Sequence, residues 1–170
     1  MPNAHALVHA CENTKVAIAR RGEQLKVIAS ESISKGQAVL TVEGRETVTP
    51  SMYSVQISST LHVDLDDPTL VDRYPERYLW RFLNHHCRPN ATLSGRTLVA
   101  INHIKAGDEV TFNYNANEYD MACPFDCWCD AHGVEAKREV RGYKHLSETE
   151  RSLISAFAAP HVKALATEDA

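Results

Sequence analysis

Short apolar segments separated by turn signals fill the chain from residue 25 to residue 114, and this pattern limits the possible folds most. At 34–37 the turn reads Ser-Lys-Gly-Gln, in which Gly36 is free to take a positive φ. The sequence Ser-Gly at 94–95 separates two alternating segments, as in a hairpin. We expect strands at 25–29, 38–42, 52–58, 62–65, 91–93, 96–101 and 110–114. A chain with many short strands and little helix in its middle is mostly β.

Helix signals are confined to two places. Residues 70–82 carry aromatic and apolar side chains at mixed helical spacings, and Pro75 is a typical first residue of a short helix. The sequence Ser-Glu-Thr-Glu at 147–150 has the form of a capping box, and the helix that follows should be kinked or divided at Pro160. The first 22 residues can add an edge strand. The fold class is therefore α+β, mostly β, with a helical C-terminal tail.

The length and net charge of the chain exclude few functions. With 170 residues, 44% apolar and 24% charged, the chain is most economically one globular domain. A net charge of -4 argues against direct nucleic-acid binding by bulk electrostatics, and a weakly acidic surface suits a basic peptide. Residues 1–10 lack the basic flank and apolar core of a secretory signal, so we expect none there, and the sequence has no apolar run of membrane-spanning length. We expect no membrane partner and a cytoplasmic location, with the nucleus still open.

Two motifs carry a family resemblance. Residues 84–90 read Asn-His-His-Cys-Arg-Pro-Asn, which resembles the Asn-His-x-Cys-x-Pro-Asn motif of SET domains. Residues 107–114 read Gly-Asp-Glu-Val-Thr-Phe-Asn-Tyr, which resembles the Gly-Glu-Glu-Leu-Thr-Phe-Asp-Tyr motif of the same family. Residues 28–37 are similar to its first turn, and the cysteines after Phe125 are similar to its post-SET tail. The order and spacing of the two motifs make the resemblance specific.

The resemblance implies a SET fold, in which small sheets surround a pseudoknot formed by a segment threaded through a loop. It divides the chain into an N-terminal segment (1–24), a SET domain (25–120), a post-SET-like segment (121–146) and a C-terminal helix (147–170). The region between the third strand and Arg81 is short, which implies a minimal insert between the two halves of the fold.

The family's chemistry would be methyl transfer from S-adenosylmethionine to a lysine side chain. Tyr114 matches the catalytic tyrosine, although a tyrosine that closes a strand is often only a core residue. Phe112 matches the position where the family has phenylalanine or tyrosine; phenylalanine implies room for more than one methyl group and can be a core residue as well. Tyr53 is either a second aromatic residue of the lysine channel or a residue of a core strand.

The resemblance also implies contacts with the cofactor S-adenosylmethionine. Asn84 and His85 match residues that contact the adenosyl moiety, and Ile28, Phe125 and Tyr114 belong to the surrounding motifs. Gln24 and Lys26 stand where the family has two glycines that let the backbone approach the methionine part.

Lys26 therefore has two interpretations. It either faces the methionine carboxylate or is a solvated lysine on a strand.

Cysteines raise the question of a zinc site. Three cysteines are in register with the family's zinc ligands: Cys87, Cys127 and Cys129. The family's fourth cysteine would fall at Val134, which cannot bind a metal. Zinc accepts sulfur and imidazole nitrogen, so Cys123 or His132 can replace it, and we expect Cys123. The alternative is a metal-free tail in which the thiols pack as small buried groups.

Three functions remain open from the sequence. The first is a protein-lysine methyltransferase with a protein or peptide partner. The second is an enzyme on the same scaffold that methylates a small molecule, as in a biosynthetic pathway. The third is a module that binds cofactor or peptide without catalysis, because a fold does not by itself determine a function. The sequence predicts no oligomeric state.

Overall fold

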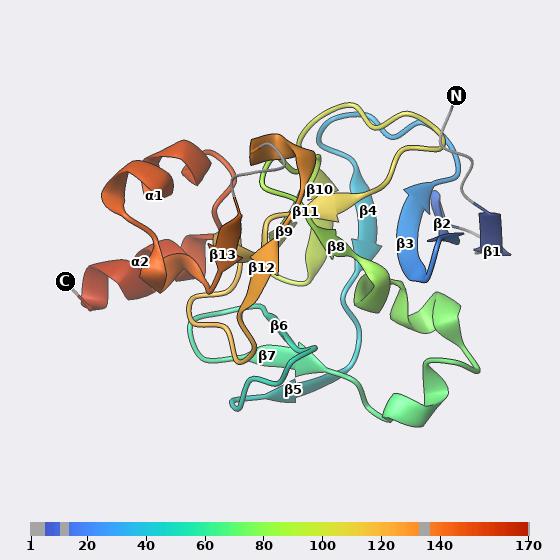
Figure 1. Ribbon diagram of the computed structural model, residues 1–170. Helices are drawn as coiled ribbons and strands as arrows, with labels where there is room; N and C mark the ends of the chain where they lie inside the picture. The colour runs from blue at the N-terminus through green and yellow to red at the C-terminus, as the bar shows by residue number, and fades with distance from the viewer. Residues whose placement is uncertain (1–5, 11–13, 133–136, 170) are drawn as a thin grey trace.

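The computed structural model describes residues 6–10, 14–132 and 137–169, which form several small sheets (Figure 1). The first sheet is antiparallel, with the order β1 (Ala6–Ala10), β2 (Val16–Arg21), β3 (Gln24–Ala29). The second has the order β4 (Ala38–Thr41), β10 (Thr97–Ala100), β9 (Ala91–Ser94). The third has the order β5 (Arg45–Thr47), β7 (His62–Asp64), β6 (Val55–Gln56).

Two further strand pairs join distant parts of the chain. In one, β8 (Asn84–His85) runs parallel to β11 (Thr111–Phe112). In the other, β12 (Phe125–Cys127) is antiparallel to β13 (Arg138–Val140). The parallel pair brings the two sequence motifs side by side, as a pseudoknot requires.

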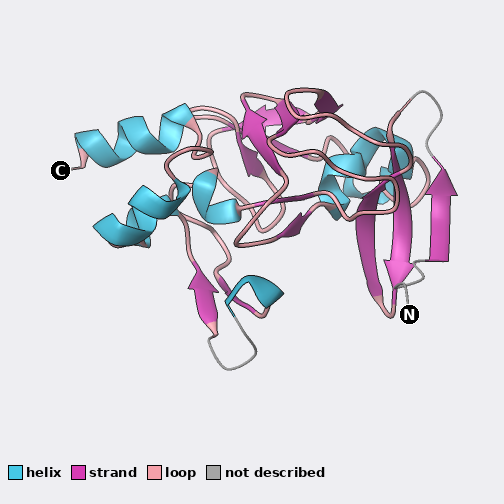
Figure 2. Cartoon of the chain, turned by 90° about the horizontal axis from the view of Figure 1, so that it is seen from above, coloured by secondary structure: helices cyan, strands magenta, loops and turns pink. Residues whose placement is uncertain are grey.

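Helices are short and mostly of the 3-10 type. The 3-10 helices are η1 (Pro68–Leu70), η2 (Pro75–Phe82), η3 (Tyr114–Ala116), η4 (Asp130–His132) and η5 (Tyr143–His145). Two α-helices, α1 (Glu148–Ile154) and α2 (Pro160–Glu168), follow at the C-terminal end. Figure 2 shows α1 and α2 at one end of the molecule and the sheet β1–β3 at the other. None of the helices in the described ranges is long and apolar enough to cross a membrane.

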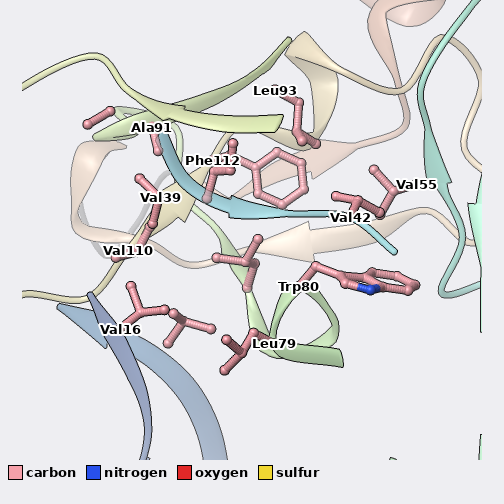
Figure 3. Close-up of a cluster of buried hydrophobic side chains, with 14 of the residues drawn as sticks. Val16, Val39, Val42, Val55, Leu79, Trp80, Ala91, Leu93, Val110 and Phe112 are labelled. Atoms are coloured by element: carbon pink, nitrogen blue, oxygen red, sulfur yellow. The ribbon is translucent and has the colours of Figure 1, made fainter. Parts of the chain in front are cut away.

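The main core lies where β2, β3, β4, η2, β9, β10 and β11 meet. Residues 16–19 of β2 are all buried, which means that both faces of this central strand are covered. Phe112 and Trp80 belong to the same cluster (Figure 3). A second cluster packs α1 and α2 against Ala116 and Tyr119, directly after the second motif. The C-terminal tail therefore supports the segment that follows Tyr114.

Most of the local predictions are confirmed. The chain is mostly β with few helices, the hairpin β9–β10 turns at Gly95 (φ 57°), and Gly36 has φ 87°. Ser147 caps α1 in a complete capping box, and Pro160 begins a separate helix, so it divides the tail.

Three predicted elements differ from the observed ones. In place of the single edge strand expected in the first 22 residues, the chain forms β1 and β2, and β2 is the central strand of its sheet. The strand expected at 52–58 is only Val55–Gln56, because Ser51 and Ser54 form a side-chain-stabilised turn before it. The short helix expected to begin at Pro75 does begin there, as η2, but it is of the 3-10 type and is interrupted at Tyr78, whose φ of -120° is not helical. Burial of the Tyr78 ring in the core accompanies this interruption.

Candidate active site and candidate metal centre

The two motifs are held together by one side chain as well as by their backbones. Asn90 donates from Nδ2 to the carbonyl of Glu109 at 2.8 Å and accepts at Oδ1 from the Thr111 amide at 2.9 Å. The His86 amide donates to the Phe112 carbonyl at 3.1 Å. Because both polar ends of the Asn90 amide are satisfied internally, this asparagine is a structural clamp between the motifs.

Tyr114 follows β11 and opens η3. Its hydroxyl donates to the carbonyl of Leu83 at 2.6 Å, and burial raises the pKa of the phenol well above its usual range. The phenol is therefore protonated throughout the neutral range. Since its proton is used by Leu83, the hydroxyl oxygen is available to other groups only as an acceptor.

His85 lies directly beside Tyr114. The Tyr114 amide donates to Nδ1 of His85 at 3.0 Å, so the ring proton belongs on Nε2, which faces Sγ of Cys87 at 3.4 Å. Burial, together with His86 and His132, lowers the pKa of His85 to about 3. The ring is therefore neutral at physiological pH, in one tautomer.

Phe125 completes an aromatic cluster at this point. Its ring meets those of His85 and Tyr114 edge-on, with centroids 5.8 Å away in both cases. Phe125 is 38% exposed, so the cluster presents an aromatic surface to solvent. Such a surface can stack against a planar ligand.

Lys26 and Asn84 share the carboxylate of Glu109. Nζ of Lys26 is 2.5 Å from Oε2 of Glu109, and Nδ2 of Asn84 donates to Oε1 of Glu109 at 2.8 Å. The Lys26 side chain is only 12% exposed, so it is not a solvated lysine. Ile28 forms an isolated backbone bridge with the same Glu109. The predicted cofactor residues on β3 and β8 are thus neighbours in space.

A pocket of about 80 Å³ opens on the side of Tyr114 where the loop before β6 lies. Its lining includes Tyr53, Trp80, Arg81, Phe112, Tyr114, Glu118 and Cys123. A space of this size accommodates only a few non-hydrogen atoms. It therefore suits a slender chain such as an alkylamine.

The other two predicted channel residues both line this pocket. Phe112 is 5% exposed, belongs to the core, and packs against Tyr114 with ring centroids 4.7 Å apart. Tyr53 is 51% exposed and lies in a loop, with the Arg81 guanidinium 3.7 Å from its ring centroid. The interpretation of Tyr53 as a core strand residue is wrong, because the strand begins two residues later.

The structure gathers four candidate metal ligands from three segments. The ligand atoms of Cys87, Cys127, Cys129 and His132 all lie within 4.8 Å of one another. Burial and the two neighbouring thiols raise the pKa of Cys87, and burial raises that of Cys127, whereas backbone hydrogen bonds lower the pKa of Cys129. Both ring nitrogens of His132 are buried without a hydrogen-bond partner. Unpaired imidazole nitrogens beside three thiols fit a tetrahedral zinc site.

Cys123 does not belong to this group. It lines the pocket at Tyr114 instead, whereas Cys127 lies in the thiol cluster. Val134, the position of the family's fourth cysteine, lies outside the described residues.

Sequence reasoning missed Glu118 and His62. Glu118 accepts from the Gln56 amide at 2.8 Å and from Nδ2 of Asn117 at 2.9 Å, and its Oε2 is 3.6 Å from Nε2 of His62. Burial raises the pKa of Glu118 to about 7, against the lowering effect of these hydrogen bonds. The only signal in the sequence was an acidic residue four positions after Tyr114.

Comparisons with known proteins agree with the motifs. A family model described as SET domain matches residues 24–115, more than half of the chain. The mouse histone-lysine N-methyltransferase, H3 lysine-36 specific, is 39% identical over 67 residues, which is 35% of this chain and 3% of that protein. The Aspergillus flavus methyltransferase flvH is 32% identical over 89 residues, 49% of this chain and 47% of that protein. The chain thus spans a small part of the first relative and about half of the second.

Solved structures with a similar fold were also found. The methyltransferase domain of human histone-lysine N-methyltransferase SETMAR is 20% identical, with a TM-score of 0.47, over 66% of this chain and 52% of that one. KRYPTONITE, in complex with mCHH DNA, H3(1-15) peptide and SAH, is 20% identical, with a TM-score of 0.49, over 72% of this chain and 29% of that one.

Proposed function

The chain belongs to the SET-domain family, and from this premise we propose that it transfers a methyl group from S-adenosylmethionine to an amine nitrogen. The observation that carries the proposal is the position of Tyr114. Tyr114 lines a narrow pocket, and its backbone amide donates to His85 in the aromatic cluster. One residue thus joins a site for a slender amine to a site for a planar ligand.

The residues on the cofactor side fit S-adenosylmethionine. The exposed ring of Phe125 and the neutral ring of His85 offer an aromatic surface for an adenine. Lys26, Glu109 and Asn84 offer a cation, an anion and an amide for the charged amino-acid end. When bound, S-adenosylmethionine supplies an activated methyl group on a sulfonium.

The protein's own contribution is orientation. Tyr114 can accept a hydrogen bond from a neutral amine, because its own proton is directed to Leu83. Phe112 and Trp80 supply apolar walls that disfavour an ammonium ion. Holding the nitrogen in line with the methyl carbon can lower the barrier by about 7–11 kcal/mol.

For the substrate we propose a protein lysine first. The supporting observations are the pocket of about 80 Å³, which suits an alkylamine, and the similarity to histone-lysine methyltransferases. The second candidate is a small-molecule amine. The observation that favours it is the similarity to flvH, which is named only as a methyltransferase. The match covers 47% of flvH but only 3% of the mouse histone-lysine N-methyltransferase.

We also propose a structural zinc ion held by Cys87, Cys127, Cys129 and His132. Zinc would be bound by three thiolates and one imidazole and would fasten β12 to the loop after β8. His85 touches Cys87, and Phe125 lies two residues before Cys127. The metal site would therefore keep both members of the aromatic surface in position.

Calorimetry with S-adenosylmethionine and S-adenosylhomocysteine tests the proposal, followed by a transfer assay. The acceptors are a histone H3 peptide containing lysine 36 and n-butylamine. We expect cofactor binding and loss of most turnover in Tyr114→Phe with binding retained, while Tyr74→Phe, a change at an exposed tyrosine, has no effect. Absence of binding at millimolar cofactor refutes the proposal. Binding without transfer to either acceptor points to a non-catalytic module.

A further inference from the structure

Glu118 is a buried carboxylate in the wall of the pocket that contains Tyr114. It lies four residues after Tyr114, and its backbone amide donates to the Tyr114 carbonyl at 2.8 Å. Its side chain is only 11% exposed to solvent, and the residue lines the pocket. A carboxylate is rarely placed in such surroundings without a partner or a function.

The two carboxylate oxygens are in different situations. Oε1 accepts two hydrogen bonds, from the Gln56 amide and from Nδ2 of Asn117. Oε2 lies 3.6 Å from Nε2 of His62, which is beyond hydrogen-bond distance. Oε1 therefore fixes the orientation of the side chain, and Oε2 keeps its capacity to take up a proton.

The other ionisable groups around Glu118 come from four elements and from neighbouring loops. His62 lies on β7, and burial and His161 lower its pKa, so it is mainly neutral. His161 on α2 donates from Nε2 to the Asn117 carbonyl at 2.7 Å, and its pKa is also lowered by burial. Arg81 on η2 and the phenol of Tyr114 line the same pocket, as do Tyr53 and Cys123 from neighbouring loops. Arg81 is thus the only lasting cation among the described residues that line the pocket.

An amine must lose a proton before it can be methylated. A lysine amine has a pKa of about 10.4 in water, so it arrives as an ammonium ion without a nucleophilic lone pair. The Arg81 guanidinium repels an ammonium ion, and the apolar walls disfavour it further. A group in the pocket that takes the proton would remove both obstacles at once.

We propose that Glu118 is the general base of this site, which accepts the proton of the substrate ammonium through Oε2. This inference rests on the proposed function. The substrate R–NH3+ gives one proton to the carboxylate, which becomes a carboxylic acid, and R–NH2 remains. The nitrogen lone pair then forms the N–C bond as the C–S bond breaks, and its electron pair stays on sulfur. After product release, Glu118 loses its proton to solvent.

The surroundings of Glu118 suit this task. Burial brings its pKa to about 7, which is near the optimum for a base that works at neutral pH. The Glu118 carboxylate would also attract a cationic amine to the pocket before the proton moves, so the same residue selects amines as a substrate class.

Infrared difference spectroscopy tests the proton transfer without a known substrate. n-Butylamine is added at pH 8 to the protein saturated with S-adenosylhomocysteine. We expect the carbonyl stretch of a protonated carboxylic acid to appear in the wild type and in Glu31→Gln, a control at an exposed glutamate, but not in Glu118→Gln. Absence of the band in the wild type overturns the inference, even if Glu118→Gln does not fold.

The pH dependence of methyl transfer gives a second test. The assay uses the acceptor that is methylated faster, either the histone H3 peptide or n-butylamine. With this acceptor, kcat/KM of the wild type should fall as the pH drops below about 7. Glu118→Gln should be slower at pH 7 by about 10²–10⁴-fold, and the deficit should shrink as rising pH deprotonates the amine. A constant deficit across the pH range would indicate a structural role only and would overturn the inference. Failure of the wild type to bind S-adenosylmethionine would instead refute the proposed function.

Discussion

Replacing Glu118 by glutamine should change how the stability of the protein depends on pH. The pKa of Glu118 is about 7 in the folded protein and 4.5 as a model value. The folded state therefore binds more protons than the unfolded state between these two values, and the free energy of unfolding falls as the pH rises through this window. The glutamine variant has no such titration.

The size of the effect follows from the shift. Each pKa unit corresponds to 1.36 kcal/mol, so a shift from 4.5 to about 7 costs the folded protein about 3 kcal/mol once the carboxylate is ionised. Between pH 5 and pH 8, the free energy of unfolding of Glu118→Gln should rise relative to the wild type by about 2 to 3 kcal/mol. The glutamine oxygen can keep the two hydrogen bonds from Gln56 and Asn117.

Urea unfolding at pH 5, 6, 7 and 8, followed by circular dichroism, measures this difference. Glu31→Gln is the matched control, because its carboxylate is 61% exposed and forms a surface ion pair with Lys15. The control should change the free energy of unfolding by a similar small amount at every pH. A constant difference between the wild type and Glu118→Gln from pH 5 to pH 8 would show that the pKa of Glu118 is not raised.

Three further outcomes are expected. Tyr114→Phe should lower the free energy of unfolding by about 1 to 3 kcal/mol in a urea titration, since the buried Leu83 carbonyl loses its donor; an unchanged midpoint would contradict that hydrogen bond. Metal analysis after purification with zinc should find one zinc per chain in the wild type and in Cys123→Ala, and much less in His132→Ala. If only Cys123→Ala loses zinc, the fourth ligand is Cys123 and not His132. Ser147→Ala should cost about 1 kcal/mol, because Ser147 caps α1 through Glu150, and equal melting temperatures would show that this cap adds nothing.

The cluster of Cys87, Cys127, Cys129 and His132 bears on how the cofactor site is kept in shape. The Cys87 thiol faces Nε2 of His85, whose Nδ1 accepts from the Tyr114 amide. A change at the thiol cluster would therefore act on the backbone of Tyr114 through one imidazole ring. This chain of contacts links the tail after residue 121 with the pocket at Tyr114.

Local features of the sequence were sufficient for much of the fold. The hairpin at Gly95, the turn at Gly36 and the cap at Ser147 depend on residues a few positions apart, so their chemistry can be read along the chain. The family resemblance implied a pseudoknot, but the parallel contact of β8 with β11 was seen only in the structure. Strands of two or three residues, such as β5 and β13, were missed because so short a segment carries no periodicity.

The sequence by itself determined the family, the mostly β character, and the candidates Tyr114, Cys87, Cys127 and Cys129, since each belongs to a motif or to a short-range pattern. Only the tertiary structure decided the contacts between distant segments. It placed His132 rather than Cys123 beside the three thiols, and it paired Lys26 with Glu109 across 83 positions. It also buried Glu118 against β6 and β7 in the wall of the pocket. Burial and charge pairing depend on which surfaces meet after folding, and no local pattern of residue types contains that information.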